Sequence, residues 1–386
     1  MNKEENKKSP LFVILFLILT GMLCFRYGQG TDYPHYEAHY CHLNAQGDLF
    51  HNALQHGELG YYVLMMIFKR SGYSFPFFAG CISLVEMIAT FRAINAHSPL
   101  KNLSLALLYP TYYLTYYYSA LRQGLVLALF LDIGLTLLKR KKRVSYCAFA
   151  VMLTLFHRSA LLLVVLPLLL RLQKPRFYMW TLAVACVVPL LIRSNLFSSY
   201  LTLLEADNYA DVSVSYMALA FRLSLTYFVV RMRKSIKKND FMERRLQRNR
   251  AQEDDETLLY RIYLLGAEIY VMLSSFALIS QRMTAPLKAV EILLIPIQLG
   301  KLLKLVGGKR RVGLLLVKFG RGRPLIAISM VILLMVNVEM AKNINSYIGQ
   351  GDYRDDINVL NFPYVSVFDK SEAFKVRRIT DDIPPP

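Results

Sequence analysis

The stretch Pro10-Leu-Phe-Val-Ile-Leu-Phe-Leu-Ile-Leu-Thr-Gly-Met-Leu-Cys-Phe25 contains no charged residue and follows a lysine-rich start. A helix needs roughly 20 mostly apolar residues to cross about 30 Å of hydrocarbon, so this run predicts a membrane helix. No small-residue cleavage site follows it, which favours a retained first helix over a signal peptide. Similar runs recur at Leu161–Leu170 and Pro324–Met340. The membrane prediction therefore extends along the whole chain.

The composition supports this interpretation. Hydrophobic residues make up 55% of the 386 residues, and the mean hydropathy is +0.33. A net charge of +19 would suggest nucleic acid in a soluble protein, but here lysine and arginine collect in short loops, as the positive-inside rule describes. These loops (139–143, 231–250 and 301–323) lack interleaved aromatic residues, so no nucleic-acid binding is predicted. The five cysteines have no metal-ligand spacing, and no metal is expected.

The predicted fold is all-α and polytopic, with one transmembrane domain over residues 1–386. Two regions are ambiguous. Residues 58–69 are too short to span and fit an interfacial or re-entrant helix, and residues 145–170 fit a hairpin of two short helices with His157-Arg158-Ser159 at its turn. With the N-terminus inside, about eleven crossings place every basic loop on the cytoplasmic side, and counts of ten to twelve stay open. The other predicted spans are 10–26, 75–94, 102–119, 121–138, 177–193, 214–231, 258–279, 285–303 and 324–341.

This topology assigns the segments between the spans. Residues 26–57 form the first extracytoplasmic loop, 231–257 a basic cytoplasmic loop or helix, and 342–386 an extracytoplasmic C-terminal tail. If 58–69 crossed the membrane, the basic block at 139–143 would face outward, which fits the charge rule less well. No internal repeat is visible, which weakens the case for an inverted-repeat transporter.

Polar residues gather on the predicted outer side. An ionisable residue at membrane depth costs about 2.5–3.5 kcal/mol on insertion scales, so it usually serves a site. Four arginines come from four separate loops, and arginine binds phosphate through a bidentate fork without a metal. A polyanion site is therefore predicted, with the tyrosine run 112–118 as a platform for sugar rings. The arginines are Arg26, Arg122, Arg158 and Arg282, and the other polar residues are Asp32, His35, Glu37, Gln123, His157, Ser159 and Gln281.

Each of these features also has a simpler interpretation. Arg26 would mark the end of a helix, and the tyrosine run would form an interfacial aromatic belt. His157 would be a buried structural histidine, Arg158 would extend to the headgroups, and Arg282 would cap a helix. Only their gathering on one side of the membrane favours a single site.

At these residues the chain resembles the EpsG family of bacterial exopolysaccharide polymerases, which are related to Wzy-type O-antigen polymerases. The chain departs from the family pattern at Ala120, where asparagine is common, and at Ala285-Pro286, where Tyr-Phe is usual. The basic insert at 231–256 is also atypical. The matching motifs, in family order, are Phe25-Arg-Tyr-Gly-Gln-Gly-Thr-Asp-Tyr-Pro34, Glu58-Leu-Gly-Tyr-Tyr62, Tyr117-Tyr-Ser-Ala-Leu-Arg-Gln-Gly124, Phe156-His-Arg-Ser-Ala-Leu161, Gln281-Arg-Met-Thr-Ala-Pro286 and Phe362-Pro-Tyr-Val-Ser-Val-Phe368.

The resemblance implies glycosyl transfer between undecaprenyl-pyrophosphate-linked oligosaccharides at the outer face of the bacterial cytoplasmic membrane. His157 is the predicted general base, because histidine suits proton transfer near neutral pH. Asp32 is the competing base and Glu58 a third. Membrane lipids, a chain-length regulator and a flippase are the other implied partners, and no cofactor is expected. The predicted substrate-binding residues are Arg26, Arg122, Gln123, Arg282, Arg158, Ser159, Tyr117 and Glu58, with Arg122 also placed among the catalytic residues.

Two other function classes stay open. A polytopic glycosyltransferase that uses a polyprenyl-phosphate sugar also carries an acidic residue in its first outer loop, where Asp32 lies in this chain. A lipid-linked oligosaccharide flippase or other transporter would place charged residues along a path through the middle of the membrane.

Overall fold

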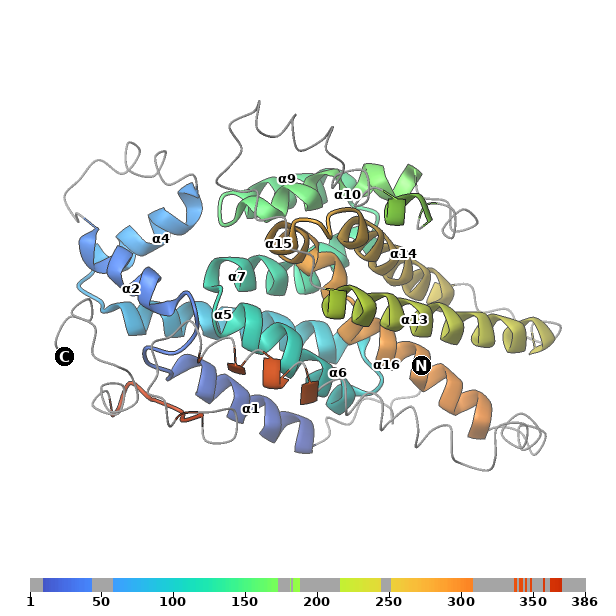
Figure 1. Ribbon diagram of the computed structural model, residues 1–386, viewed down its shortest axis with the longest axis horizontal. Coiled ribbons are helices and arrows are strands. Elements are labelled where there is room, and N and C mark those ends of the chain that lie inside the picture. Colours follow the sequence, from blue (N-terminus) through green and yellow to red (C-terminus); the bar gives the residue numbers. More distant parts are fainter. Residues whose placement is uncertain are drawn as a thin grey trace. The chain divides into compact units, whose positions relative to one another are not determined.

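The computed structural model describes residues 10–43, 58–172, 181, 183–187, 216–243, 251–307 and 362–369, with scattered positions between 337 and 357 (Figure 1). Most of these residues are helical, and their one β feature is an isolated bridge between Arg26 and Ser366. This confirms the predicted all-α class. The chain forms two compact units, one of residues 1–133, 152–158 and 310–386, and the other of residues 134–151 and 159–309.

The first unit is built around α5 (Phe75–His97), against which α1 (Pro10–Cys24) and α7 (Leu121–Leu129) pack. A proline in the first turn of α5 replaces a backbone N–H that would have no partner within the helix. The helix buries Phe78, Ile82 and Met87 against its neighbours. α5 therefore carries the core of this unit.

An aromatic cluster fixes α2 (Tyr33–His42) and α4 (Leu59–Arg70) against α5. The rings of Tyr40 and Phe78 stack with centroids 5.8 Å apart, and Tyr61 meets Phe78 edge-on at 5.6 Å. Such ring pairs stabilise beyond their buried area by about 0.5–1.5 kcal/mol each. The cluster sets the positions of the tyrosines that line the pocket described below.

The segment predicted as span 102–119 is helical but not uniform. α6 (Lys101–Leu108) continues into the π-helix η2 (Tyr109–Tyr117), where Pro110 has no N–H for a regular helical hydrogen bond. A second π-helical stretch, η3 (Phe130–Gly134), joins α7 to α8 (Leu135–Lys139). The predicted span 121–138 is thus one continuous helix with a widened middle.

The second unit contains most of the two helices of the predicted hairpin. α9 (Arg143–Thr154), whose last residues belong to the first unit, is followed by the short η4 (Arg158–Ala160) and by α10 (Leu161–Leu172). The Tyr146 hydroxyl donates to the Leu163 carbonyl at 3.0 Å, which ties the two helices together. The remaining helices are α13 (Tyr216–Glu243), α14 (Ala251–Met272), α15 (Ala277–Ala289) and α16 (Glu291–Gly307).

A break between α15 and α16 lies within the predicted span 285–303, which the structure forms as a bent pair of helices. The helix axes of residues 279–289 and 291–302 differ by 42°. Glu291 begins α16 and pairs with Arg222 of α13 at 2.5 Å, with both side chains buried. A carboxylate at this position also meets the positive end of the helix dipole. The apolar run is therefore interrupted at Glu291, a buried carboxylate that begins α16 and is paired with α13.

Two helices of the described part are long and apolar enough to cross a membrane, Phe75–His97 and Leu121–Lys139, and a third if the bent pair is one span. α1 has 15 residues, fewer than the predicted span 10–26. α4 agrees with the short helix predicted over 58–69. The predicted spans 177–193 and 324–341 lie largely outside the described residues. The count of eleven crossings therefore stays a prediction.

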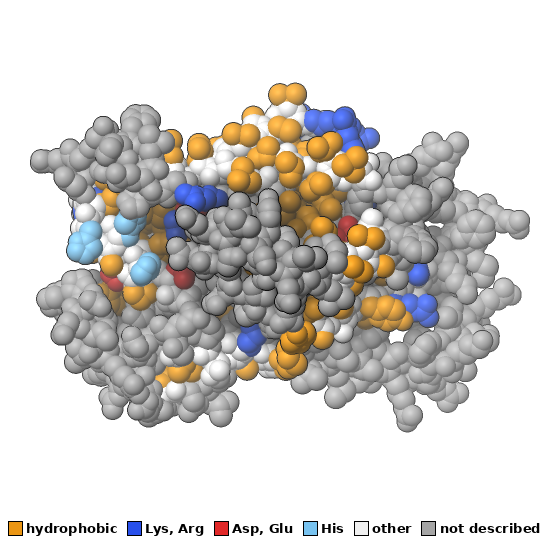
Figure 2. Space-filling view, turned by 45° about the horizontal axis from the view of Figure 1, so that its top comes forward, with side chains coloured by type: hydrophobic (Ala, Val, Ile, Leu, Met, Phe, Trp, Pro, Cys, Tyr) orange, Lys and Arg blue, Asp and Glu red, His pale blue; other side chains and the backbone are white. Residues whose placement is uncertain are grey.

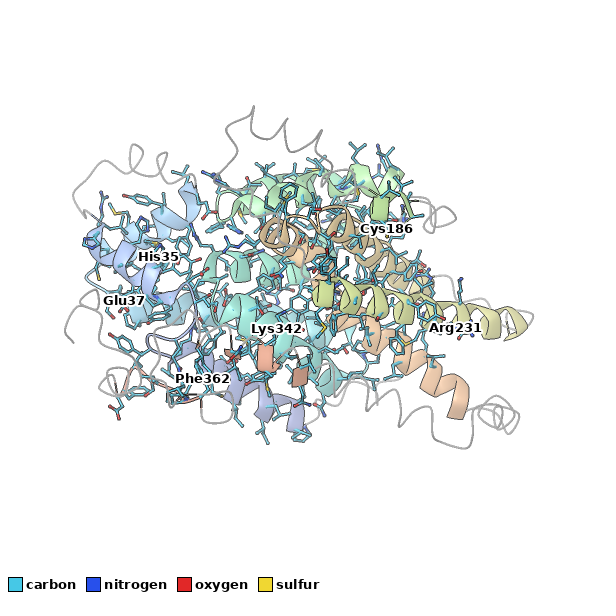
Figure 3. The ribbon with its side chains drawn as sticks, viewed as in Figure 1. His35, Glu37, Cys186, Arg231, Lys342 and Phe362 are labelled. Atoms are coloured by element: carbon cyan, nitrogen blue, oxygen red, sulfur yellow. The ribbon has the colours of Figure 1, made fainter. Side chains whose placement is uncertain are left out.

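The C-terminal segment 362–369 pairs with the backbone that follows α1. The Tyr27 N–H donates to the Val365 carbonyl at 2.9 Å, and the Val367 N–H donates to the Phe25 carbonyl at 2.8 Å. Gln29 donates to the Pro363 carbonyl at 2.5 Å and accepts from the Val365 N–H at 3.0 Å. Phe362, labelled in Figure 3, packs against this contact. This contact places residues 25–29 and 362–369 side by side, so the two segments are expected on the same side of the membrane.

This pairing predicts a labelling pattern. In chains that keep one cysteine at a time, Cys41 and an Asp369→Cys variant are expected to react equally with a membrane-impermeant thiol reagent added to whole cells, because both positions are exposed on the predicted outer side. A Lys142→Cys variant, in the predicted inner loop, is the control and is expected to react only after the cells are opened. Opposite labelling of Cys41 and position 369 would contradict the shared side.

Candidate functional site

Glu58 is the residue at which helix α4 begins. Its carbonyl accepts a hydrogen bond from the Tyr62 N–H at 3.2 Å, and the Gly60 N–H donates to the Leu155 carbonyl at 2.8 Å. A Cβ atom on Gly60 would meet the Leu155 Cβ at 3.0 Å. Glycine at this position therefore lets the first turn of α4 lie directly against the residues that precede His157.

The Glu58 carboxylate joins two segments that are distant in the sequence. Its Oε2 accepts from Arg122 Nη1 at 2.5 Å, and its Oε1 lies 2.6 Å from His157 Nδ1 and 3.3 Å from the Arg158 backbone N. The Glu58 residue is only 7% exposed. We call Glu58, Arg122 and His157 the Glu58 cluster. All three residues belong to the first unit, so their arrangement is defined within one compact body.

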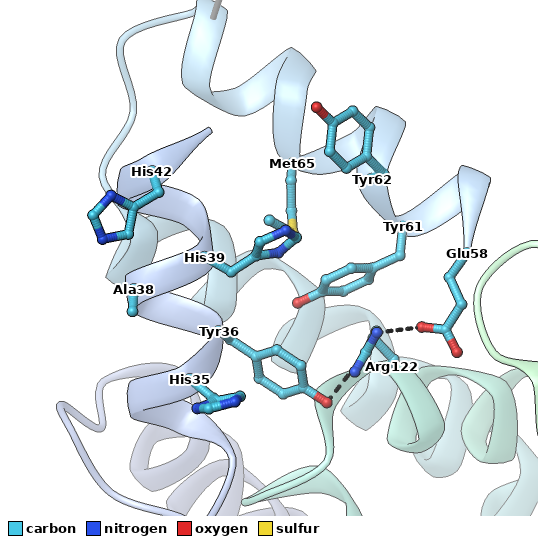
Figure 4. Close-up of a pocket in the computed structure, with 10 residues that line it drawn as sticks. All are labelled: His35, Tyr36, Ala38, His39, His42, Glu58, Tyr61, Tyr62, Met65 and Arg122. Carbon is cyan, nitrogen blue, oxygen red and sulfur yellow. Dashed lines mark hydrogen bonds and ion pairs between the residues drawn. The ribbon is translucent and has the colours of Figure 1, made fainter. Parts of the chain in front are cut away.

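Arg122 lies in the first turn of α7 and is held on several sides. Its Nε donates to the Tyr36 hydroxyl at 3.3 Å (Figure 4). Its guanidinium carbon lies 5.0 Å from the ring centroid of Tyr36 and 5.8 Å from that of Tyr61, within cation–π range. Within the described residues, its Nη2 has no hydrogen-bond partner. Arg122 therefore has a fixed position and one terminal nitrogen available to a ligand.

The charges of the cluster fix the tautomer of His157. Burial raises the pKa of Glu58, but the hydrogen bond from His157 and the charge of Arg122 outweigh it, so the pKa lies below its ordinary value of 4.5. An ionised carboxylate only accepts hydrogen bonds, so His157 Nδ1 carries the proton that it donates. In the neutral imidazole, Nε2 then has a free lone pair, which is the arrangement of a histidine base oriented by a carboxylate.

A pocket of about 410 Å³ adjoins the cluster between α2 and α4 (Figure 4). Glu58 and Arg122 form one edge of it, and burial raises the pKa of the Tyr36 phenol on the same side. The lining residues are His35, Tyr36, Ala38, His39, His42, Glu58, Tyr61, Tyr62, Met65 and Arg122.

The model of the EpsG family matches residues 10–347. This chain belongs to the EpsG family. The match confirms the resemblance and points to an exopolysaccharide polymerase-type role, a glycosyltransferase-like activity in the general sense. Together with the apolar helices, it indicates a membrane protein. No curated protein and no solved structure matches the chain.

Three of the EpsG motifs meet in the Glu58 cluster. Glu58 comes from Glu58-Leu-Gly-Tyr-Tyr62, Arg122 from the Leu121-Arg-Gln-Gly124 element, and His157 from Phe156-His-Arg-Ser-Ala-Leu161. Gly124 has a packing reason, because a Cβ atom there would lie 2.5 Å from Glu86 Oε1 and 2.9 Å from the Tyr116 carbonyl. The motif therefore supplies both the arginine and the glycine that lets α7 pack closely.

Arg26, from the first EpsG motif, lies in the core of the first unit at 2% exposure. Its Nη1 donates to the Leu23 carbonyl at 2.5 Å and to Ser83 Oγ at 3.0 Å, and its Nη2 donates to the Tyr117 carbonyl at 3.1 Å. The Tyr118 ring lies 5.1 Å from its guanidinium carbon. The structure thus separates Arg26 from the pocket lining, and its predicted contact with pyrophosphate stays a prediction.

The tyrosine run is also buried. Tyr117 is 0% exposed, and its hydroxyl lies 2.6 Å from Thr90 Oγ1, while the Tyr113 hydroxyl donates to the Leu19 carbonyl at 2.7 Å. Gln123 is buried as well. Asp32 precedes α2 and accepts from the Thr31 hydroxyl at 3.2 Å. Tyr117, Gln123 and Asp32 do not line the pocket.

The other predicted site residues lie at the hairpin and in the second unit. The Arg158 backbone reaches Glu58, while its side chain is exposed. Ser159 Oγ is buried without a hydrogen-bond partner in the described part of the chain. Arg282 lies on α15 of the second unit. Its predicted place beside Arg122 therefore stays a prediction.

The pocket lining contains His35, Glu58 and Arg122, which the sequence singled out, and also residues that it did not single out. Tyr36 and Tyr61 hold Arg122, yet neither was predicted as a site residue. One signal was available: His35, His39 and His42 are spaced four and three residues apart, which puts them on one face of a helix.

Proposed function

We propose that this chain is a polysaccharide polymerase that joins undecaprenyl-pyrophosphate-linked repeat units at the outer face of the bacterial cytoplasmic membrane. The observation that carries the proposal is the Glu58 cluster, a carboxylate that holds a histidine and an arginine together in a chain of the EpsG family. Its parts match glycosyl transfer, which needs a base for the acceptor and a cation for the leaving group.

The donor is the growing glycan on undecaprenyl pyrophosphate, and the acceptor is the non-reducing end of a second lipid-linked unit. The acceptor hydroxyl oxygen attacks the anomeric carbon of the donor and passes its proton to His157 Nε2. The bond from the anomeric carbon to the pyrophosphate oxygen breaks, and undecaprenyl pyrophosphate leaves with the electron pair. Proton transfer of this kind contributes about 10²–10⁴-fold to a rate.

Arg122 is the proposed partner of the leaving group. It has a fixed charge, and its free Nη2 is the atom available to a phosphate oxygen. Arg158, which belongs to the same unit, is proposed to add positive charge to the same pyrophosphate. Glu58 is a positioning residue, because it orients His157 and Arg122, and its carboxylate stays ionised near neutral pH.

The proposal is tested by reconstituting the full chain in liposomes with purified lipid-linked repeat units. A ladder of products that differ by whole repeat units is the expected result. Addition of one sugar from a polyprenyl-phosphate donor would assign the chain to the other glycosyltransferase class. Movement of the lipid-linked unit across the bilayer without bond formation would assign it to the transporters, and either result overturns the polymerase.

A further inference from the structure

Most residues that line the pocket between α2 and α4 do not belong to the Glu58 cluster. The pocket's tyrosines and Met65 form an aromatic and apolar wall, and its histidines form a polar side. The volume of about 410 Å³ lies at the low end of small-molecule sites, which span about 300–1,000 Å³. The pocket therefore has room for one or two sugar rings.

The Tyr61 hydroxyl is the strongest indication of a ligand. The side chain is 3% exposed, and its hydroxyl has no hydrogen-bond partner among the residues that the structure describes. Figure 4 shows it directed from α4 into the space beside Tyr36 and His39. A buried hydroxyl without a partner costs free energy, and a ligand hydroxyl in the pocket would remove that cost.

The histidines supply further polar atoms for a ligand rich in hydroxyl groups. His35 and His42 are exposed, and Figure 2 shows histidine side chains gathered at one end of the face in view. A neutral imidazole offers one donor and one acceptor, which is the pattern that a sugar hydroxyl also offers. In the described part of the chain, no three histidine, cysteine or acidic side chains are placed to share a metal ion.

Away from the edge formed by Glu58 and Arg122, the pocket lining favours a neutral ligand. The one arginine of the lining is paired with Glu58, the one carboxylate of the lining, at 2.5 Å. We propose that this pocket binds one pyranose ring of the glycan beside the bond that is formed, with Tyr61 and the α2 histidines bound to its hydroxyl groups. The inference rests on the proposed function and names the part of the substrate that this pocket holds.

The test measures binding without catalysis. The probe is the repeat-unit oligosaccharide freed from its lipid by mild acid, titrated by calorimetry into the full chain in nanodiscs. Tyr61→Phe removes one hydroxyl and keeps the ring, so binding is expected to weaken about five- to tenfold. Ala38→Trp fills the pocket from an exposed position and is expected to weaken binding more than tenfold. Tyr33→Phe, at a buried tyrosine outside the pocket lining, is the matched control and is expected to bind like the wild type.

Shortened probes show whether the bound sugar ring belongs to the donor or to the acceptor. If the pocket holds the acceptor, removal of the non-reducing terminal sugar abolishes the difference between wild type and Tyr61→Phe. If it holds the donor, removal of the reducing-end sugar does so. Equal binding by wild type, Tyr61→Phe and Ala38→Trp would overturn the proposal.

Failure of this inference differs from failure of the proposed function. If ladders form but the Tyr61 and Ala38 variants bind the oligosaccharide normally, the proposed polymerase activity is supported and the proposed sugar pocket is contradicted. If the oligosaccharide binds in the predicted pattern but no ladder forms, the proposed sugar pocket is supported and the proposed polymerase activity is contradicted.

Discussion

A Glu58→Ala variant is expected to polymerise about 10³-fold more slowly than the wild type, while the protein still folds and inserts. The carboxylate fixes the position of Arg122 and the tautomer of His157, so its removal disturbs the base and the cation together. The measurement is the initial rate of ladder formation in liposomes. Glu58→Gln keeps an oxygen acceptor but loses the charge, and its rate is expected to lie between those of the wild type and Glu58→Ala.

The matched control for this prediction is Asp132→Asn. Asp132 also pairs with an arginine, Arg92, at 3.3 Å, but the Arg92 side chain is 67% exposed. Asp132 does not line the pocket, and its arginine partner is mostly exposed, so little change in the rate of ladder formation is expected. A Glu58→Ala variant as active as Asp132→Asn would contradict the role of the Glu58 cluster.

An Arg26→Ala variant is expected to lower the free energy of unfolding by about 3 kcal/mol or more. The change removes three charge-assisted hydrogen bonds and leaves the Leu23 and Tyr117 carbonyls buried without that donor. It also removes the positive charge that acts on the buried Glu86 carboxyl. The measurement is chemical or thermal unfolding of the purified chain in detergent.

Arg92→Ala is the control, because it removes an arginine with a mostly exposed side chain from the same unit. Its effect on unfolding is expected to stay below about 0.5 kcal/mol. The experiment also tests the pyrophosphate prediction for Arg26. Wild-type stability together with lost polymerisation would assign Arg26 to the substrate instead of to the core.

The helical class and the hairpin near His157 followed from apolar runs and their interruptions, because these signals are local. The contact between the three residues of the Glu58 cluster was not predicted, although each of them was predicted as a site residue. Glu58 lies 64 residues from Arg122 and 99 from His157. Their meeting depends on how α4 lies against Leu155, and no periodicity of the sequence encodes that contact.

The tyrosines show a second limit. The run 112–118 suggested a sugar platform, but Tyr117 is buried in the core, whereas Tyr36 and Tyr61 line the pocket. A tyrosine has an apolar ring and a polar end, so its type alone does not distinguish core from site. The break before Glu291 was not predicted either. Arg222, the partner of Glu291, is 69 residues away, and both charged residues lie in segments that are otherwise apolar.

The contact between residues 25–29 and 362–369 has a consequence for the order of synthesis. The segment after α1 is made early, but its hydrogen-bond partners are made only when the chain is nearly complete. Until then, the backbone groups of Phe25 and Tyr27 that Val365 and Val367 later bind lack those partners. A chain that stops before residue 362 therefore cannot form these hydrogen bonds to Phe25 and Tyr27.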